Sequence, residues 1–313
     1  MNVFGSLKEK LGADRVMAQK NLEQYLTLRT ITIAEYFFEA RSKKDLIASF
    51  SAAKLLGIPY FILGGGTNLA VTSKKITGLV VRNLFLDYYY FVRNDEYADL
   101  SVSSGYPMSL VVKRTVEDGY SGFEYQMGLP GTIGGAIYMN SKWTRPQSYV
   151  GDQLISAELL TPDEKVKKVD RDYFRFAYDY SFLQKTKEIV LSAVFRLKSH
   201  SSDELKTRST EALEYRKKTQ PFGVKSSGCF FRNVSDEEKA KHNLPTSSAG
   251  YLIDQAGLKG KRIGGFAVSD IHANFILNEG DGKQEDLVKL LSVIKRTVFE
   301  KFGIQLSPEV LVI

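Results

Sequence analysis

The sequence predicts a protein of mixed helices and strands, of the α+β or α/β class, in two or three lobes. The 313 residues exceed the usual length of one domain. Short apolar runs alternate with amphipathic segments along the whole chain. A polar stretch at 199–203 interrupts this series, so we place a domain boundary between 1–198 and 199–313.

Individual elements follow from local patterns. Residues 42–57 predict a helix, because Leu46, Phe50 and Ala53 share one face and Gly57 ends it. Further predicted helices cover 107–117, 205–218 and 284–302, and predicted strands cover 60–63, 78–81, 100–103, 154–160, 189–197 and 309–313. The helix over 284–302 keeps apolar residues at a spacing of three or four, which predicts packing on a core.

Composition limits the functional classes. With 43% hydrophobic and 25% charged residues, the chain is typical of a globular protein. The net charge of +7 is dispersed, which favours small anionic ligands over nucleic acid. No run approaches a membrane span and no secretory h-region is visible, so we expect a cytoplasmic protein without membrane insertion. Nothing in the sequence requires an oligomer.

Cysteine and histidine are scarce. The single Cys229 cannot form an intramolecular disulfide. The three histidines, His200, His242 and His272, are widely separated. We therefore expect no metal site.

A strand over 60–63 leads into the first glycine-rich passage. Glycines let a ligand approach the backbone closely, and consecutive amides can hold phosphate oxygens. The candidate phosphate-binding residues here are Gly64, Gly65, Gly66, Thr67 and Asn68. The passage matches neither a Walker loop nor G-x-G-x-x-G, and an ordinary tight turn is the alternative.

The second glycine-rich passage covers 128–136. Pro130 stiffens the loop, which enters a short predicted helix over 134–140. A helix N-terminus presents N–H groups to a phosphate. The candidate residues are Gly128, Gly131, Thr132, Gly134 and Gly135. Two phosphate-binding loops in one lobe predict one dinucleotide held by both.

The third passage, 220–233, contains Cys229 between Gly228 and a predicted short aromatic strand. A lone cysteine is commonly a small buried hydrophobe. Its thiol, with a reference pKa of about 8.5, is alternatively a usable proton donor near neutrality. A fourth set of glycine-containing segments follows at 249–260, 264–268 and 272–276.

These four passages, in this order and spacing, resemble the compact form of the UDP-N-acetylenolpyruvoylglucosamine reductases (UDP-N-acetylmuramate dehydrogenases), from about Leu22 to the C-terminus. The resemblance implies an α+β fold, with an FAD-binding lobe of the vanillyl-alcohol-oxidase (PCMH) type and a C-terminal substrate-binding lobe. It implies an oxidoreductase in which NADPH reduces FAD, and the flavoprotein reduces UDP-N-acetylglucosamine enolpyruvate to UDP-N-acetylmuramate. This reaction serves peptidoglycan synthesis, and so cell wall biogenesis, cell shape and cell division.

The resemblance also assigns residues. The two glycine-rich passages would bind FAD. Cys229 stands where the family has a proton-donating serine, and Glu309 matches a second acid that polarises the enol ether. Lys217 and Asn233 match positions that contact the substrate, a UDP-sugar. No histidine precedes His200, so a covalent tether in the FAD lobe is absent and FAD is expected to bind non-covalently.

Two positions depart from the family pattern. Asp179 stands where an arginine is expected to assist the substrate carboxylate, and Arg171 or Arg175 are candidates to replace it. Ile31-Thr32 stands where two glycines are usual. Two alternatives stay open: an FAD oxidoreductase of the same fold with another substrate, and a catalytically impaired flavin- or nucleotide-binding homologue.

Overall fold

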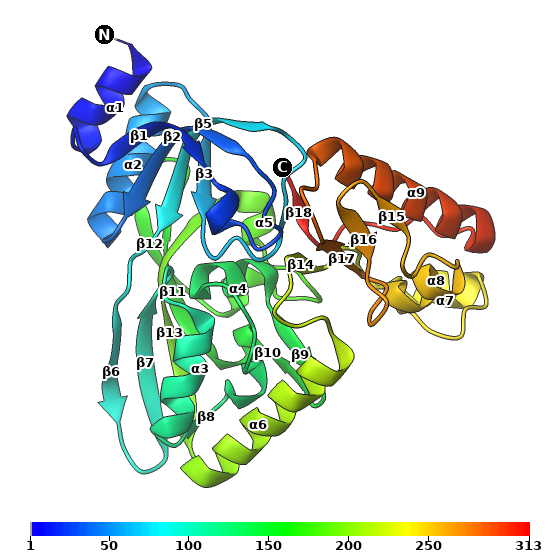
Figure 1. Ribbon diagram of the computed structural model, residues 1–313. Helices are drawn as coiled ribbons and strands as arrows, with labels where there is room; N and C mark the ends of the chain where they lie inside the picture. The colour runs from blue at the N-terminus through cyan, green and yellow to red at the C-terminus, as the bar shows by residue number, and fades with distance from the viewer. Residues whose placement is uncertain (1) are drawn as a thin grey trace. The chain divides into compact units, whose positions relative to one another are not determined.

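The computed structural model describes residues 2–313, which form two compact units (Figure 1). Unit 1 contains residues up to Lys20, then Ala34–Gly65 and Thr77–Arg216. Unit 2 contains Asn21–Ile33, Gly66–Ile76 and Lys217–Ile313. Two short segments of the N-terminal half therefore belong to the C-terminal unit. The division after residue 198 stays a prediction.

The first half of unit 1 is a four-stranded sheet with two helices. Its strands, in spatial order, are β1 (Val16–Asn21), β2 (Ile33–Ala40), β5 (Lys75–Asn83) and β3 (Tyr60–Leu63). Helices α1 (Val3–Leu11) and α2 (Lys43–Leu55) bury Leu7, Leu46 and Ala53 in its core. Strands β3 and β5 run parallel. The first glycine-rich passage follows directly after β3 at the C-terminal end of this pair.

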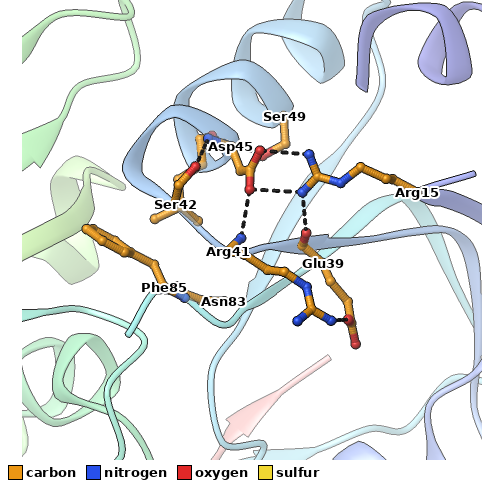
Figure 2. A network of polar contacts seen from close by, with 9 residues as sticks. Arg15, Glu39, Arg41, Ser42, Asp45, Ser49, Asn83 and Phe85 are labelled. Atoms are coloured by element: carbon orange, nitrogen blue, oxygen red, sulfur yellow. Dashed lines mark hydrogen bonds and ion pairs between the residues drawn. The ribbon is translucent and has the colours of Figure 1, made fainter. Parts of the chain in front are cut away.

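A polar network fixes the start of α2 (Figure 2). Arg15 donates two hydrogen bonds of 2.9 Å to the two carboxylate oxygens of Asp45. Asp45 also accepts from the Arg41 amide at 2.9 Å, while its own amide donates to Ser42 Oγ at 3.1 Å. The guanidinium of Arg15 holds the pKa of Asp45 below its usual value. Ser42 Oγ therefore caps the helix, and the Asp45 carboxylate ties its first turn to Arg15, just before β1.

We expect Asp45→Asn to lower the free energy of unfolding by about 1.5–3 kcal/mol, because bonds to a charged acceptor are lost. The folded-state pKa lies below the unfolded one, so this contribution is complete above the unfolded value. The stabilisation is lost as the pH falls below about 4 and through the lowered pKa of Asp45 in the folded protein. Thermal unfolding at pH 7 and at pH 3 tests this, with the exposed Asp14→Asn as the control. An equal loss at both pH values would contradict the assignment.

The second half of unit 1 is a six-stranded sheet. Its main path is β12 (Val166–Asp170), β11 (Leu154–Leu160), β13 (Ile189–Ser199), β7 (Tyr97–Ser103) and β6 (Tyr88–Arg93), and β8 (Tyr120–Ser121) pairs with β13. Helices α3 (Met108–Glu117) and α4 (Ile133–Met139) share one apolar core with this sheet, and Leu205 of α6 (Ser202–Thr219) joins it. The hairpin of β9 (Lys142–Thr144) and β10 (Gln147–Tyr149) and the short helix α5 (Leu183–Thr186) complete this half. Helix α4 begins within the second glycine-rich passage.

Unit 2 packs helices on a four-stranded antiparallel sheet. The strand order is β14 (Ser226–Cys229), β17 (Phe275–Asn278), β16 (Phe266–Val268) and β15 (Arg262–Ile263). Helices α8 (Ala249–Gln255) and α9 (Gln284–Phe302) supply Leu252, Leu287 and Ile294 to its core, and α7 (Asp236–Lys241) is short and polar. A separate parallel pair joins β4 (Leu69–Ala70) to β18 (Leu311–Val312).

The structure confirms the predicted helices and strands with small changes in their ends. The helix over 284–302 and the strands over 60–63 and 154–160 have the predicted bounds. One prediction is wrong. In the part of the chain that the structure describes, the strand β14 ends at Cys229, and the aromatic residues that follow it are not a strand. Within residues 2–313, no helix has the length and apolar character needed to cross a membrane.

Candidate active site

The two glycine-rich passages meet inside unit 1. A Cβ atom added to Gly64, directly after β3, would lie 2.6 Å from the Oγ1 atom of Thr132, at the start of α4. Real Cβ atoms do not approach that closely, so only glycine permits this spacing. Gly65 and Gly135 are exposed on either side, which leaves their backbone open to a ligand. The prediction that both loops face one ligand therefore has a geometric basis in unit 1.

A third turn, which the sequence reasoning missed, joins these loops. Asn83 at the end of β5 donates to Ser104 Oγ at 2.8 Å, and the Gly134 amide donates to Ser104 O at 2.8 Å. A Cβ on Gly105 would lie 2.5 Å from Asn83 Oδ1. The Ser-Ser-Gly sequence at the end of β7, which is typical of a turn, is the sequence feature that could have predicted it. This turn holds the two sheets of unit 1 together beside the glycine-rich loops.

The start of α4 differs from the prediction. The helix begins at Ile133, one residue early, and two of its first amides already have partners. Ile133 N donates to Tyr106 O at 3.0 Å, and Gly134 N donates to Ser104 O at 2.8 Å. The Gly134 amide therefore already has a backbone partner, and its role in FAD binding stays a prediction. The amides of Gly131, Thr132 and Gly135 are the remaining candidates in this passage.

The first glycine-rich passage is shared between the units. Gly64 and Gly65 belong to unit 1, whereas Gly66, Thr67 and Asn68 belong to unit 2. Gly66 has φ +62°, and a Cβ there would lie 2.0 Å from Tyr25 O. Its carbonyl accepts from the Thr27 amide at 3.1 Å. Close packing inside unit 2 thus accounts for this glycine without any ligand.

Gly128 is likewise required by packing, in unit 1. It has φ +79°, and a Cβ there would lie 2.9 Å from Leu213 and 3.2 Å from Arg216 on α6. The Arg216 guanidinium in turn lies over the ring of Trp143 in β9, 4.7 Å from its centroid. The start of the second passage therefore packs closely against α6.

Cys229 lies at a bulge in unit 2. Ser226 pairs with Leu277 and Cys229 with Phe275, so β14 has one residue more than β17 over this stretch. Gly228 absorbs the irregularity with φ +82°. Bulges of this kind redirect the side chains beside them. The Cys229 side chain is only partly buried, unlike the small core hydrophobe that was the alternative interpretation.

The structure places Glu309 beside the cysteine strand. The Glu309 amide donates to Phe230 O at 2.9 Å, one residue after Cys229, and Phe231 forms an antiparallel bridge with Pro308. Asn68 Nδ2 donates to Glu309 O at 3.4 Å. Unit 2 therefore brings the backbone segments that carry Cys229 and Glu309 together with one end of the first glycine-rich passage, although they are far apart in the sequence.

The two predicted substrate residues flank the segment that contains β14. Lys217 lies near the C-terminal end of α6, and Asn233 lies beyond β14. Asn233 is exposed, and its Oδ1 accepts from the Ala249 amide at 3.1 Å at the start of α8. In the loop between α6 and β14, Phe222 and Val224 are 52% and 45% exposed, so this loop has apolar surface.

Asp179 does not present a bare negative charge. Its two oxygens accept hydrogen bonds of 2.7 and 2.8 Å from Lys142 Nζ. The arginines that sequence reasoning put forward are engaged elsewhere: Arg171 donates to Gly151 O at 2.8 Å, and Arg175 lies 4.4 Å from the Phe182 ring centroid. No sequence signal linked Lys142 to Asp179, because they are separated by a hairpin and two strands.

The second departure, at Ile31-Thr32, is integrated into unit 2. Thr32 is fully buried, and its carbonyl accepts from the Leu22 amide at 2.8 Å. The Gln284 side-chain amide donates to Ile31 O at 2.6 Å and to Thr32 Oγ1 at 3.3 Å. Gln284 of α9 thus binds this segment, in which neither residue is a glycine.

Comparison with known proteins agrees with this organisation. Residues 34–170 match the FAD binding domain family, and residues 220–313 match the C-terminal domain of UDP-N-acetylenolpyruvoylglucosamine reductase. The UDP-N-acetylenolpyruvoylglucosamine reductase of Protochlamydia amoebophila is 36% identical over 277 residues, covering 88% of this chain and 87% of that protein. The corresponding protein of Caldicellulosiruptor bescii is 33% identical over 92% of this chain and 88% of its own.

A solved structure extends the likeness to three dimensions. The crystal structure of UDP-N-acetylenolpyruvylglucosamine reductase from Thermus caldophilus matches with a TM-score of 0.75 and 28% sequence identity. The match covers 95% of this chain and 97% of that one. With the sequence relatives, this confirms the α+β fold of an FAD-binding lobe followed by a substrate lobe. The chain belongs to the UDP-N-acetylenolpyruvoylglucosamine reductase family.

Proposed function

We propose that this protein reduces UDP-N-acetylglucosamine enolpyruvate to UDP-N-acetylmuramate, with non-covalent FAD and NADPH. The observation that carries the proposal is the pairing of Cys229 and Glu309 on adjoining backbone segments of unit 2, in a chain of this family. Reduction of an enol ether adds one hydride and one proton, and a thiol can donate that proton while a nearby carboxyl group polarises the double bond. A cytoplasmic location and a role in peptidoglycan synthesis, cell shape and division belong to the same proposal.

The residues present fit an FAD diphosphate. Because Gly64 lies against Thr132 without a side chain, two stretches of backbone can reach the same phosphate oxygens. The amides of Gly65, Gly131 and Gly135, with the hydroxyl of Thr132, are the proposed donors in unit 1. Thr67 and Asn68 are the proposed donors in unit 2. In our proposal Gly66, Gly128 and Gly134 act by allowing close packing.

When bound, FAD would supply hydride chemistry at the enolpyruvyl methylene carbon, with NADPH as the source of the hydride. Cys229 Sγ gives a proton to the neighbouring carbon, and the thiolate regains its proton from solvent. Glu309 polarises the enol ether, so that the new proton and the hydride enter adjacent carbons. Lys217 and Asn233 hold the nucleotide and its phosphates, which fixes the reacting carbons beside the thiol.

Anaerobic stopped-flow measurement of flavin absorbance tests the proposal. NADPH should bleach the flavin, and the enolpyruvyl sugar nucleotide should then restore its absorbance. Bleaching by NADPH followed by reoxidation with a different acceptor only would identify an FAD oxidoreductase for another substrate. Bound flavin that neither compound changes would identify an impaired homologue.

A further inference from the structure

Asn83 is a buried polar residue of unit 1 that no step of the proposed reaction uses. It is only 4% exposed, and it is the last residue of β5. Leu63, the last residue of the neighbouring strand β3, pairs with Arg82. Asn83 follows Arg82 directly, just as Gly64 follows Leu63. The buried amide therefore lies at the level of the sheet where the first glycine-rich passage begins.

Both polar atoms of the Asn83 side chain have defined partners. Nδ2 donates to Ser104 Oγ at 2.8 Å, and Oδ1 accepts from the Phe85 amide at 3.1 Å. Gly105 leaves room for this side chain, because a Cβ there would lie 2.5 Å from Asn83 Oδ1. The Asn83 amide is thus held in one orientation, in which it binds the turn after β7.

Ser104 in turn contacts the second glycine-rich passage. Ser104 O accepts from the Gly134 amide at 2.8 Å, and a Cβ on Gly134 would lie 3.0 Å from Ser104 Cβ. A second backbone bond continues the contact, because Met108 N donates to Gly131 O at 3.0 Å. The position of residues 131–134 therefore depends on the position of the turn that contains Ser104.

Other bonds keep this turn folded when the Asn83 side chain is removed. The Ser104 amide donates to Leu191 O of β13 at 3.0 Å, and Ser103 Oγ donates to Phe85 O at 2.6 Å. These bonds hold the turn on the six-stranded sheet and on the segment that follows β5. The bond from Asn83 to Ser104 differs from them, because it links the turn to β5 itself, the strand beside β3. Its loss leaves the turn formed and removes a direct link to the strand pair that carries Gly64.

We infer that Asn83 is a positioning residue for FAD. Through Ser104, it sets the spacing between the second glycine-rich passage and the part of the first passage that lies in unit 1. This inference rests on the proposed function, in which amides of both passages bind the same diphosphate. Hydrogen bonds weaken steeply as their geometry departs from the preferred range, so a small shift of one passage lowers the affinity for FAD. Asn83 itself does not touch the cofactor.

The FAD affinities of Asn83→Ala and Ser104→Ala test the inference. Each variant is freed of flavin, checked for its fold by far-UV circular dichroism and titrated with FAD, with flavin fluorescence as the signal. We expect each to bind FAD about fivefold to thirtyfold more weakly than the wild type, the factor that corresponds to one buried hydrogen bond. The double variant should bind FAD no more weakly than Asn83→Ala alone, because both substitutions remove the same bond.

Ser49→Ala is the matched control for a loss of stability alone. Ser49 is fully buried in α2 of the same unit, and its hydroxyl donates to Leu46 O at 2.9 Å. This variant should lower the unfolding temperature of the flavin-free protein and bind FAD as the wild type does. If Asn83 only stabilises the fold, Asn83→Ala will behave in the same way.

Wild-type FAD affinity in folded Asn83→Ala or Ser104→Ala would overturn the inference, and so would fully additive losses in the double variant. If Asn83→Ala does not fold, Ser104→Ala decides, since it keeps every backbone bond of the turn. Failure of the proposed function gives a different result, because the wild-type protein itself would then bind no FAD.

Discussion

Cys229→Ala should slow reoxidation of the reduced flavin by the enolpyruvyl nucleotide about 10²–10⁴-fold, the usual contribution of a positioned general acid. Flavin reduction by NADPH should continue at the wild-type rate, because that half-reaction needs no proton from the thiol. Cys229 is partly exposed at the end of β14, so its replacement by alanine leaves no large cavity. Stopped-flow absorbance separates the two steps.

Cys229→Ser is the matched control, since a hydroxyl can donate a proton from the same position. It should recover much of the reoxidation rate that Cys229→Ala loses. Equal slowing of both half-reactions in Cys229→Ala would assign the thiol a structural role. Wild-type reoxidation in that variant would remove Cys229 from the mechanism.

Gly64→Val should lower FAD affinity at least about tenfold, and activity should fall with it. The Cβ of any larger residue would lie 2.6 Å from Thr132 Oγ1 and would force the two glycine-rich passages apart. Overpacking of this kind costs about 1–3 kcal/mol, and 1.4 kcal/mol is a factor of ten in affinity. Titration of FAD into the flavin-free protein, followed by flavin fluorescence, measures the effect.

Gly280→Ala is a suitable control, because a Cβ there has its nearest neighbour at 3.9 Å. It should bind FAD as the wild type does. The smaller change Gly64→Ala should weaken FAD binding less than Gly64→Val does, because it adds one methyl group against Thr132 Oγ1 instead of three carbon atoms. Wild-type FAD affinity in Gly64→Val would contradict the proposed meeting of the two passages.

Strong local patterns were sufficient to predict most elements of the fold. The helix over 284–302 has the predicted bounds because its apolar spacing agrees with the face buried in unit 2. The glycine-rich passages were recognisable because few other residues allow such backbone approach. The contact between these passages at Gly64 and Thr132 depends on the order of strands in two sheets. Local sequence patterns do not encode that order.

Other features depend on contacts between distant parts of the chain. The Asn21–Ile33 segment belongs to unit 2 because side chains such as Asn278, which donates to Leu28 O at 2.9 Å, bind its backbone. The amides of Ile133 and Gly134 are occupied by carbonyls of the turn after β7. The pairing of Lys142 with Asp179 joins the start of β9 to the loop around 177–181, which Asn140 at the end of α4 also binds. No periodicity or motif encodes such pairings.

The central claim is that two glycine-rich passages hold one FAD without a covalent bond. The flavin content of the purified chain tests it most directly. Heat denaturation should release one FAD per chain into the supernatant and leave no flavin in the precipitated protein. A colourless protein that takes up no added FAD would contradict the claim, and flavin retained in the precipitate would contradict its non-covalent form.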